Sequence, residues 1–313
     1  MSITTAHQKD TLEHRLATLA PFVGRTPLFP IQRAYQKEGV RIFAKLEWMQ
    51  MGQSVKSRPG FQIISDAILE GHLRHGMGLL DATSGNTGIA YATFGAALGI
   101  PVTLCLPENA SEERKTILRS LGVNIIFTSR FEGTDGAQEK AKEIAAANPE
   151  QYFYADQYAN DNNWKAHFEH TGPEIIEQTE GRITHFVAGL GTTGTFTGTG
   201  RKLKEWNPST RLIGLQPNTP MHGLEGWKHL ETAIVPKIYD PLVPDDIHEV
   251  DTAESYEVIK KVAADEGLLL SPSSAANLLG AMKVADSINE GVVVTVFPDN
   301  GDKYQEVFKN LFG

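Results

Sequence analysis

Three glycines follow an apolar run in the stretch HFVAGLGTTGTFTGTGRKL. Gly189, Gly191 and Gly194 have the spacing G-x-G-x-x-G, which occurs in loops that bind dinucleotides. A dinucleotide site also needs an acidic residue about 20 positions further on, at the end of the next strand, to bond a ribose hydroxyl. The next apolar run, RLIGLQP, has Gln216 at that place. The spacing therefore favours a phosphate loop of another kind over a dinucleotide-dependent oxidoreductase.

The threonines of the same loop favour a compact phosphate. Thr192, Thr193 and Thr195 add hydroxyl groups to the free backbone N–H groups at the start of a helix that we expect from Gly194. The positive end of the helix dipole favours an anion at this place. A tight strand-to-helix turn without a ligand is the alternative, because short glycine motifs also occur by chance.

A second polar loop follows another apolar run. The stretch DATSGNTG contains the short polar side chains of Thr83, Ser84, Asn86 and Thr87. Together with free backbone N–H groups, such side chains suit a carboxylate. Ordinary helix capping would explain the same residues when they are considered alone.

A third candidate is Lys56, in the stretch GQSVKSR. Most lysines are solvated surface charges. A lysine at a helix N-terminus, however, has its ammonium form disfavoured, which favours the neutral amine that forms a Schiff base. A phosphate loop, a carboxylate loop and such a lysine together indicate pyridoxal phosphate with an amino-acid substrate.

Strand-like and helix-like segments alternate along most of the chain. This alternation predicts βαβ units, largely parallel sheets and an α/β fold, with functional loops at the carboxyl ends of the strands. The expected strands are 41–46, 79–82, 102–106, 124–128, 185–188, 211–215 and 292–297. The expected helices are 55–71, 87–98, 111–121, 136–147, 163–178, 194–205, 253–266, 274–288 and 303–312. The Pro- and Gly-rich segment 216–246 is either an active-site loop or a long connection.

Composition excludes several classes of function. The net charge of −9 argues against a nucleic-acid or anionic-membrane partner. A single cysteine, Cys105, excludes an internal disulfide and suits a reducing compartment. The uncharged stretch 89–107 is interrupted by Gly99 and Pro101, so we expect a helix and a strand there, not a membrane span. The polar N-terminus predicts no secretory signal.

These ordered motifs resemble the cysteine synthase (O-acetylserine sulfhydrylase) family of fold-type-II pyridoxal-phosphate enzymes, over nearly the whole chain from Val23. The stretch TGPEIIEQTEGRITHFVAGLGTTGTFTGTGRKLKE is most similar to the bacterial B-type branch. The resemblance implies two open α/β domains with twisted, largely parallel sheets, like tryptophan synthase β. The larger domain would comprise 1–47 with 157–313, and the smaller 48–156. A cytoplasmic homodimer is also implied.

The resemblance also implies a role for each motif residue. Lys56 would be the catalytic residue, linked to pyridoxal 5'-phosphate and later moving protons. The other cofactor-binding residues would be Asn86 at the ring hydroxyl, Ser273 at the pyridine nitrogen, and Gly191, Thr192, Thr193, Gly194 and Thr195 at the phosphate. The substrate carboxylate would be bound by Thr83, Ser84, Thr87 and Gln157. No metal is expected.

The implied reaction is β-replacement, in which O-acetylserine gives an aminoacrylate that accepts sulfide to form cysteine. Departures from the family pattern, such as Ser57 after the lysine and Asn300 near the C-terminus, leave the donor and the sulfur source open. An O-phosphoserine-dependent enzyme, a cystathionine β-synthase, a dehydratase and a catalytically idle binding protein are the alternatives. Segment 216–230 contains no arginine that would bind a phosphate ester, which favours the acetyl ester.

Two further patterns suggest metal sites. His167 and His170 are three residues apart on an expected helix, but no third ligand follows. The stretch DNGD, 299–302, is similar to the start of a calcium loop, yet position twelve is Asn310. Packing explains the histidines better, and a turn that caps the last helix explains DNGD better.

Overall fold

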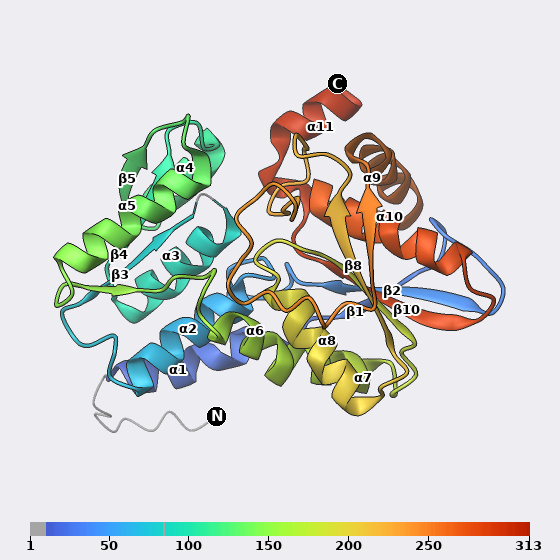
Figure 1. Ribbon diagram of the computed structural model, residues 1–313, viewed down its shortest axis with the longest axis horizontal. Helices are drawn as coiled ribbons and strands as arrows, with labels where there is room; N and C mark the ends of the chain where they lie inside the picture. The colour runs from blue at the N-terminus through green and yellow to red at the C-terminus, as the bar shows by residue number, and fades with distance from the viewer. Residues whose placement is uncertain (1–10, 84) are drawn as a thin grey trace, which may run out of the picture.

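The computed structural model describes residues 11–83 and 85–313. In this part of the chain the strands form two separate sheets (Figure 1). Helices cover both faces of each sheet, which gives the three-layered α/β architecture that the alternating sequence pattern predicts. No helix in the described ranges is long and apolar enough to cross a membrane.

The larger sheet has the strand order β1-β2-β10-β7-β8-β9. Its strands are β1 (Leu28–Ile31), β2 (Val40–Leu46), β7 (His185–Gly189), β8 (Arg211–Pro217), β9 (Asp246–Val250) and β10 (Gly291–Phe297). Only the pairing of β1 with β2 is antiparallel among these described strands. Side chains of β7 alternate between the two faces: Phe186 packs with α7 (Gly172–Gln178) and α8 (Gly194–Trp206), and Val187 packs with α9 (Thr252–Glu266) and α10 (Pro272–Asp286).

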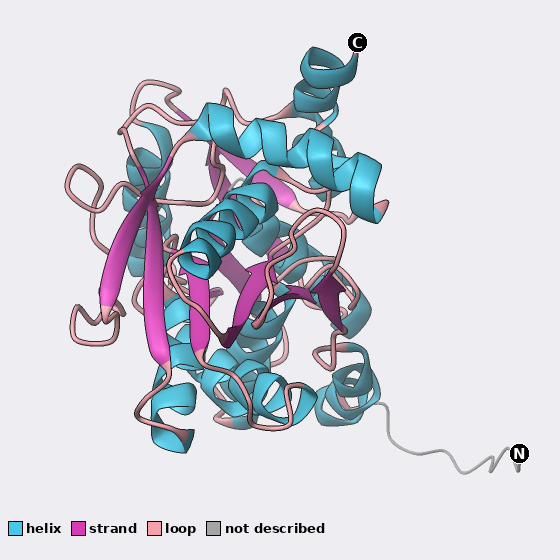
Figure 2. Cartoon of the chain, turned by 90° about the vertical axis from the view of Figure 1, so that its right-hand side faces the viewer, coloured by secondary structure: helices cyan, strands magenta, loops and turns pink. Residues whose placement is uncertain are grey.

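The smaller sheet is parallel throughout its described strands, in the order β5-β4-β3-β6. These strands are β3 (Gly78–Ala82), β4 (Val102–Pro107), β5 (Asn124–Thr128) and β6 (Tyr152–Tyr154). The helices on one face are α1 (Leu12–Leu19), α2 (Ser57–Leu69), α3 (Asn86–Leu98) and α4 (Glu112–Ser120). Helix α5 (Gly133–Ala147) covers the other face. Figure 2, in which the larger sheet is turned towards the viewer, shows helices on either side of that sheet.

The α/β fold is present, and so is every expected strand, each with bounds within two residues of the expected ones. The sequence pattern does not predict α1, the short strands β1 and β6, or the edge strand β9. Only Val250 of β9 is buried, so this strand lacks the apolar run of a buried strand. All four strands of the smaller sheet lie within 48–156, whereas those of the larger sheet lie on either side of that range. The division into domains at 47/48 and 156/157 stays a prediction.

The expected helix 163–178 is wrong as a single α-helix. It divides into α6 (Asn162–Ala166), a π-helical turn (His167–Thr171) and α7. Pro173 lacks the N–H that an uninterrupted helix needs there, and wider turns of this kind often occur at functional sites. The π-turn brings His167 against the start of α8.

The C-terminal segment also differs from the expectation. Asn300 caps a short 3₁₀ helix (Gly301–Lys303) by accepting a hydrogen bond from the N–H of Asp302, and α11 begins only at Gln305 (Gln305–Phe312). The DNGD turn therefore does not cap the last helix itself. It turns the chain so that Asp299 and Tyr304 face the loops of the smaller sheet.

Candidate active site

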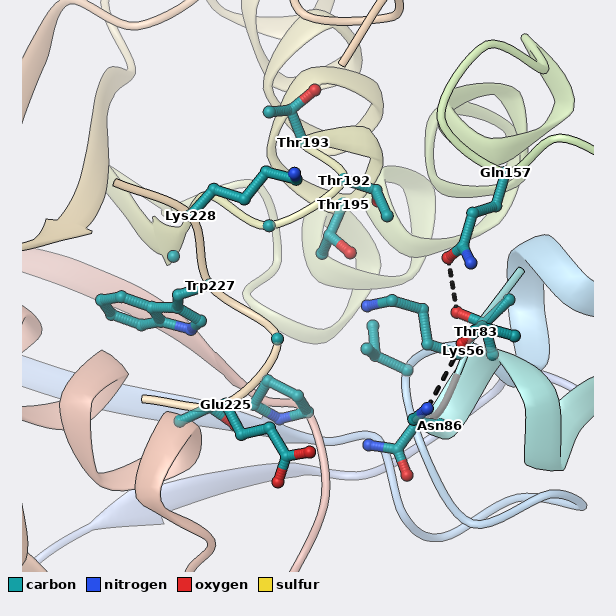
Figure 3. A pocket seen from close by; sticks show the side chains of 18 of the residues that line it. Lys56, Thr83, Asn86, Gln157, Thr192, Thr193, Thr195, Glu225, Trp227 and Lys228 are labelled. Atoms are coloured by element: carbon teal, nitrogen blue, oxygen red, sulfur yellow. Dashed lines mark hydrogen bonds between the residues drawn. The ribbon is translucent and has the colours of Figure 1, made fainter. Parts of the chain in front are cut away.

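A pocket lies where the carboxyl ends of β3, β7 and β10 meet, between the two sheets (Figure 3). Parallel sheets place their binding loops at this edge. Ten of the residues expected from the sequence line it: Lys56, Thr83, Asn86, Thr87, Gln157, Gly191, Thr192, Thr193, Thr195 and Ser273. Gly194 begins α8 directly behind the loop, and Ser84 lies outside the described residues.

Lys56 is the N-cap residue of α2, and its side chain points into the pocket (Figure 3). Its ammonium group has no hydrogen-bond partner among the described residues. Burial lowers the pKa of this amine, although the carboxylates of Asp299 and Glu47 act in the opposite direction. The positive helix end also disfavours the charged form. The site therefore shifts the pKa of Lys56 in the direction that favours a neutral amine.

A buried ionic network holds the start of α2. The guanidinium of Arg58 donates to both carboxylate oxygens of Glu47, at 2.7 and 2.9 Å, and to both of Glu174, at 2.7 and 2.8 Å. The Lys45 amine lies 2.7 Å from Glu174. Burial alone would raise the pKa of Glu174, but Arg58 and Lys45 lower it to about 2. Because Arg58 lies two residues after Lys56, this network fixes the place of the lysine.

The phosphate loop needs glycine at two positions because other chain segments approach it closely. A Cβ atom on Gly191 would overlap the carbonyl oxygen of Gly226, and one on Gly194 would overlap the side chain of Asn163. Thr193, between them, has a left-handed backbone with φ of 71°, which a β-branched residue adopts only at a cost of about 1–3 kcal/mol. Strain of this size at a pocket indicates a functional constraint.

The hydroxyl groups of the loop differ in their hydrogen-bond partners. The Thr193 hydroxyl is buried without a partner among the described residues. The Thr195 hydroxyl lies 3.2 Å from Nε2 of the buried His167, whose Nδ1 lies 2.9 Å from the hydroxyl of Thr171. Burial lowers the pKa of His167 well below its usual value. A neutral His167 that accepts from Thr171 at Nδ1 would place its proton on Nε2 and leave the Thr195 hydrogen free for an anion.

The second loop presents donors suited to a carboxylate. The Thr87 hydroxyl donates to Oε1 of Gln157 at 2.7 Å, and Nε2 of Gln157 donates to the carbonyl of Ala82 at 3.3 Å. The second Nε2 proton of Gln157 stays available, as do N–H groups at the start of α3. The Thr83 hydroxyl accepts from the N–H of Gly85 at 3.3 Å. The structure thus brings together the described members of the expected carboxylate site.

Asn86 and Ser273 line the pocket from two different helices, α3 and α10. Asn86 is the first residue of α3, and its amide contacts Asp299 and Lys303 at 2.8 and 2.9 Å. One Nδ2 proton is therefore engaged and the other remains. Ser273, near the start of α10, lies with its hydroxyl 3.2 Å from that of Ser271. A neutral hydroxyl at this place provides no counter-charge for a protonated ring nitrogen.

Several residues of the pocket wall are not predicted by the sequence motifs. They are Arg114 from α4, Glu225 and Trp227 from the loop after β8, and Tyr304 after β10. Asp299 lies behind this wall, where its carboxylate accepts hydrogen bonds from Asn86 and Tyr304. For Glu225 and Trp227 the signal is the weak periodicity of segment 216–246, which predicts either an active-site loop or a long connection. Its residues Glu225 to Lys228 line the pocket, which decides for the active-site loop.

The residues present fit pyridoxal phosphate. The buried, unpartnered Thr193 hydroxyl and the tight glycine loop provide a cradle for the phosphate, and Lys56 provides an unpaired amine in the same pocket. The two suggested metal sites have no such support. His167 is bonded to two threonines, and the described residues contain no cluster of three or more His, Cys, Asp or Glu side chains placed for a metal ion.

Comparison with known proteins decides the family. Residues 19–299 match the family described as pyridoxal-phosphate dependent enzyme. The chain belongs to this family. A cysteine synthase of Aquifex aeolicus is 47% identical over 92% of this chain and 90% of its own length. Cysteine synthase B of Escherichia coli is 36% identical over 92% of this chain and 94% of its own length.

Solved structures agree with the sequence relatives. The cysteine synthase of Entamoeba histolytica superimposes with a TM-score of 0.88 at 30% identity, over all of this chain and 94% of its own. The O-acetylserine dependent cystathionine beta-synthase of Helicobacter pylori superimposes with a TM-score of 0.86 at 32% identity, over 98% of each chain. The resemblance to cysteine synthases, the fold class and the pyridoxal-phosphate cofactor are therefore confirmed, and a dinucleotide oxidoreductase is excluded.

Proposed function

We propose that this enzyme makes L-cysteine from O-acetyl-L-serine and sulfide by β-replacement. The observation that carries the proposal is the meeting, in one pocket, of Lys56, the phosphate loop and the carboxylate loop. Relatives named cysteine synthase support the product. The donor and the sulfur source rest on the family resemblance, and the acetyl donor also on the lack of arginine in 216–230.

The roles of the residues follow from their positions. Gly191 to Thr195 would hold the cofactor phosphate, Asn86 would contact the ring hydroxyl, and Ser273 would lie at the ring nitrogen. When bound, pyridoxal phosphate attaches the amino acid covalently and withdraws electrons from its α-carbon. The neutral Nζ of Lys56, released from the cofactor, would take the α-proton.

Thr83, Ser84, Thr87 and Gln157 would orient the substrate by its carboxylate, so that the α-hydrogen faces Lys56. The carboxylate does not react, but the energy of binding it would be used to position the α-carbon, which does react. The neutral hydroxyl of Ser273 suits a reaction in which negative charge on the α-carbon is removed at once by loss of acetate.

A cystathionine β-synthase is the second candidate, because relatives from Bacillus subtilis and Helicobacter pylori are named O-acetylserine dependent cystathionine beta-synthase. Such an enzyme would use homocysteine in place of sulfide. We also propose, on the family resemblance, a cytoplasmic homodimer with the domain division given above. Sedimentation equilibrium of the holoenzyme tests the dimer.

The visible absorption spectrum of the purified holoenzyme tests the function. A yellow band that changes on addition of O-acetylserine and returns on addition of sulfide, with release of cysteine, is the expected result. A band that responds only to O-phosphoserine or serine would contradict the acetyl donor. Return of the band with homocysteine but not with sulfide would favour the second candidate.

A further inference from the structure

An ion pair joins the two sides of the pocket at its mouth. Arg114 of α4, from the layers of the smaller sheet, donates Nη2–H to Oε2 of Glu225 at 2.6 Å, and its Nη1 contacts Oε1 of the same carboxylate. Glu225 belongs to the loop after β8 of the larger sheet, and Figure 3 shows it on the pocket wall. Both residues line the pocket, so this bidentate pair faces any substrate that enters.

The two partners are buried to different degrees. The Arg114 side chain is only 4% exposed, whereas that of Glu225 is 47% exposed. The guanidinium of Arg114 also lies over the ring of Tyr304, 5.4 Å from its centroid. The arginine is thus built into the pocket wall, and the glutamate covers it from the solvent side.

The backbone holds Glu225 in this place. The next residue, Gly226, has its carbonyl oxygen against Gly191 of the phosphate loop, and the N–H of Lys228 donates to the carbonyl of Leu190 at 2.8 Å. Leu224, on the other side, is fully buried. A loop fixed at both ends keeps the carboxylate on Arg114.

The pair decides whether the mouth attracts anions. A free guanidinium fork in a poorly solvated wall binds phosphate and sulfate groups through two parallel hydrogen bonds. Here the fork is already occupied by a carboxylate, and the carboxylate itself repels a second anion. The sequence contains no arginine in 216–230, but the fold supplies one from α4 and at the same time neutralises it.

We propose that Glu225 is a specificity-determining residue that restricts the donor to amino acids with an uncharged β-substituent. By occupying Arg114 it excludes phosphate esters and other oxyanions from the part of the pocket beyond the carboxylate loop. This inference rests on the proposed function for the identity of the donor. The charge at the mouth can be measured independently of turnover.

The test is a calorimetric titration of the holoenzyme with sodium sulfate at constant ionic strength, which measures the affinity for sulfate. Glu225→Gln frees the fork and should bind sulfate at least about tenfold more tightly than the wild type. The double variant Arg114→Gln with Glu225→Gln should lose that gain. The matched control is Glu112→Gln on the same helix, whose exposed carboxylate pairs with Lys115 outside the pocket lining; it should behave as the wild type.

Turnover gives the second measurement. The ratio of kcat/KM for O-phosphoserine to that for O-acetylserine should rise at least about tenfold in Glu225→Gln. Equal sulfate affinity in the wild type and Glu225→Gln, or a gain that persists in the double variant, would overturn the proposal. Glu225→Ala gives the same comparison if the glutamine variant folds poorly. A holoenzyme indifferent to O-acetylserine would refute the proposed function, while the sulfate titration would still decide the role of Glu225.

Discussion

Asn86, which lines the pocket, is joined to the buried carboxylate of Asp299 on the other sheet. Nδ2 of Asn86, at the start of α3, donates to Oδ2 of Asp299, just after β10, at 2.8 Å. The same oxygen accepts the hydroxyl of Tyr304 at 2.9 Å. Asp299 is fully buried. One carboxylate oxygen thus fixes the place of a predicted cofactor contact.

Removing this carboxylate should destabilise the protein more than removing one of its donors. Asp299→Ala leaves the partly buried amide of Asn86 and the buried hydroxyl of Tyr304 without an acceptor, so we expect the free energy of unfolding to fall by about 1–3 kcal/mol per lost partner. Tyr304→Phe removes a single hydrogen bond and should cost about 0.5–1.5 kcal/mol. Urea unfolding of the holoenzymes measures both. Equal losses of unfolding free energy in Asp299→Ala and Tyr304→Phe would show that the hydrogen bond from Asn86 contributes nothing to stability.

Lys56→Ala should abolish turnover but leave the cofactor pocket intact. Loss of a positioned general base lowers the rate by about 10²–10⁴-fold, and loss of the linking amine removes the covalent attachment. Borohydride reduction and mass spectrometry should detect the cofactor adduct in the wild type and not in the variant. Lys260→Ala, on the exposed face of α9, serves as the control. Normal turnover in Lys56→Ala would contradict the role of this lysine.

Gln157→Ala should weaken substrate binding without weakening cofactor binding. A hydrogen bond to a charged carboxylate contributes about 1.5–3 kcal/mol, so KM for O-acetylserine should rise by one to two orders of magnitude. The affinity for pyridoxal phosphate, titrated by absorbance, should stay unchanged. Gln62→Ala, whose side chain bonds Asp66 on α2 away from the pocket, is the matched control. An equal loss of both affinities would reject the carboxylate role.

Asp81 should make the stability depend on pH. Burial beneath the carboxylate loop raises the pKa of this carboxyl to about 7, against about 3.9 in the unfolded chain. Between these values the folded state binds more protons than the unfolded state, so the contribution of Asp81 to stability falls as the pH rises. Asp81→Asn removes this dependence.

Urea unfolding of the wild type and Asp81→Asn at pH 5 and pH 8 measures the effect. The variant should gain stability relative to the wild type at the higher pH, by up to about 1.4 kcal/mol for each pKa unit crossed. Glu150→Gln, at a side chain that is 87% exposed, should differ from the wild type equally at both pH values. A constant difference for Asp81→Asn as well would mean that its carboxyl titrates alike in both states.

Local signals in the sequence were enough to locate the loops. Gly191 and Gly194 have no space for a side chain, and Lys56 lies where a loop ends and a helix begins. Each motif therefore reflects a constraint on the nearby backbone, which a short stretch of sequence can reveal. The alternation of apolar β-branched runs with helical patterns likewise determined the α/β class, because burial on both faces of a parallel sheet demands such runs.

Only the tertiary structure decided which distant residues meet these loops. Arg114 and Glu225 are 111 positions apart, and Asn86 and Asp299 are 213 apart. The periodicity of the sequence does not predict such pairs. The residues next to each partner in the sequence are those found around ordinary surface charges or helix caps. Their contact depends on how the two sheets pack. The sequence by itself therefore determined the cofactor class and predicted Lys56 as its lysine, and the packing of the sheets decided which charged residues meet at the pocket.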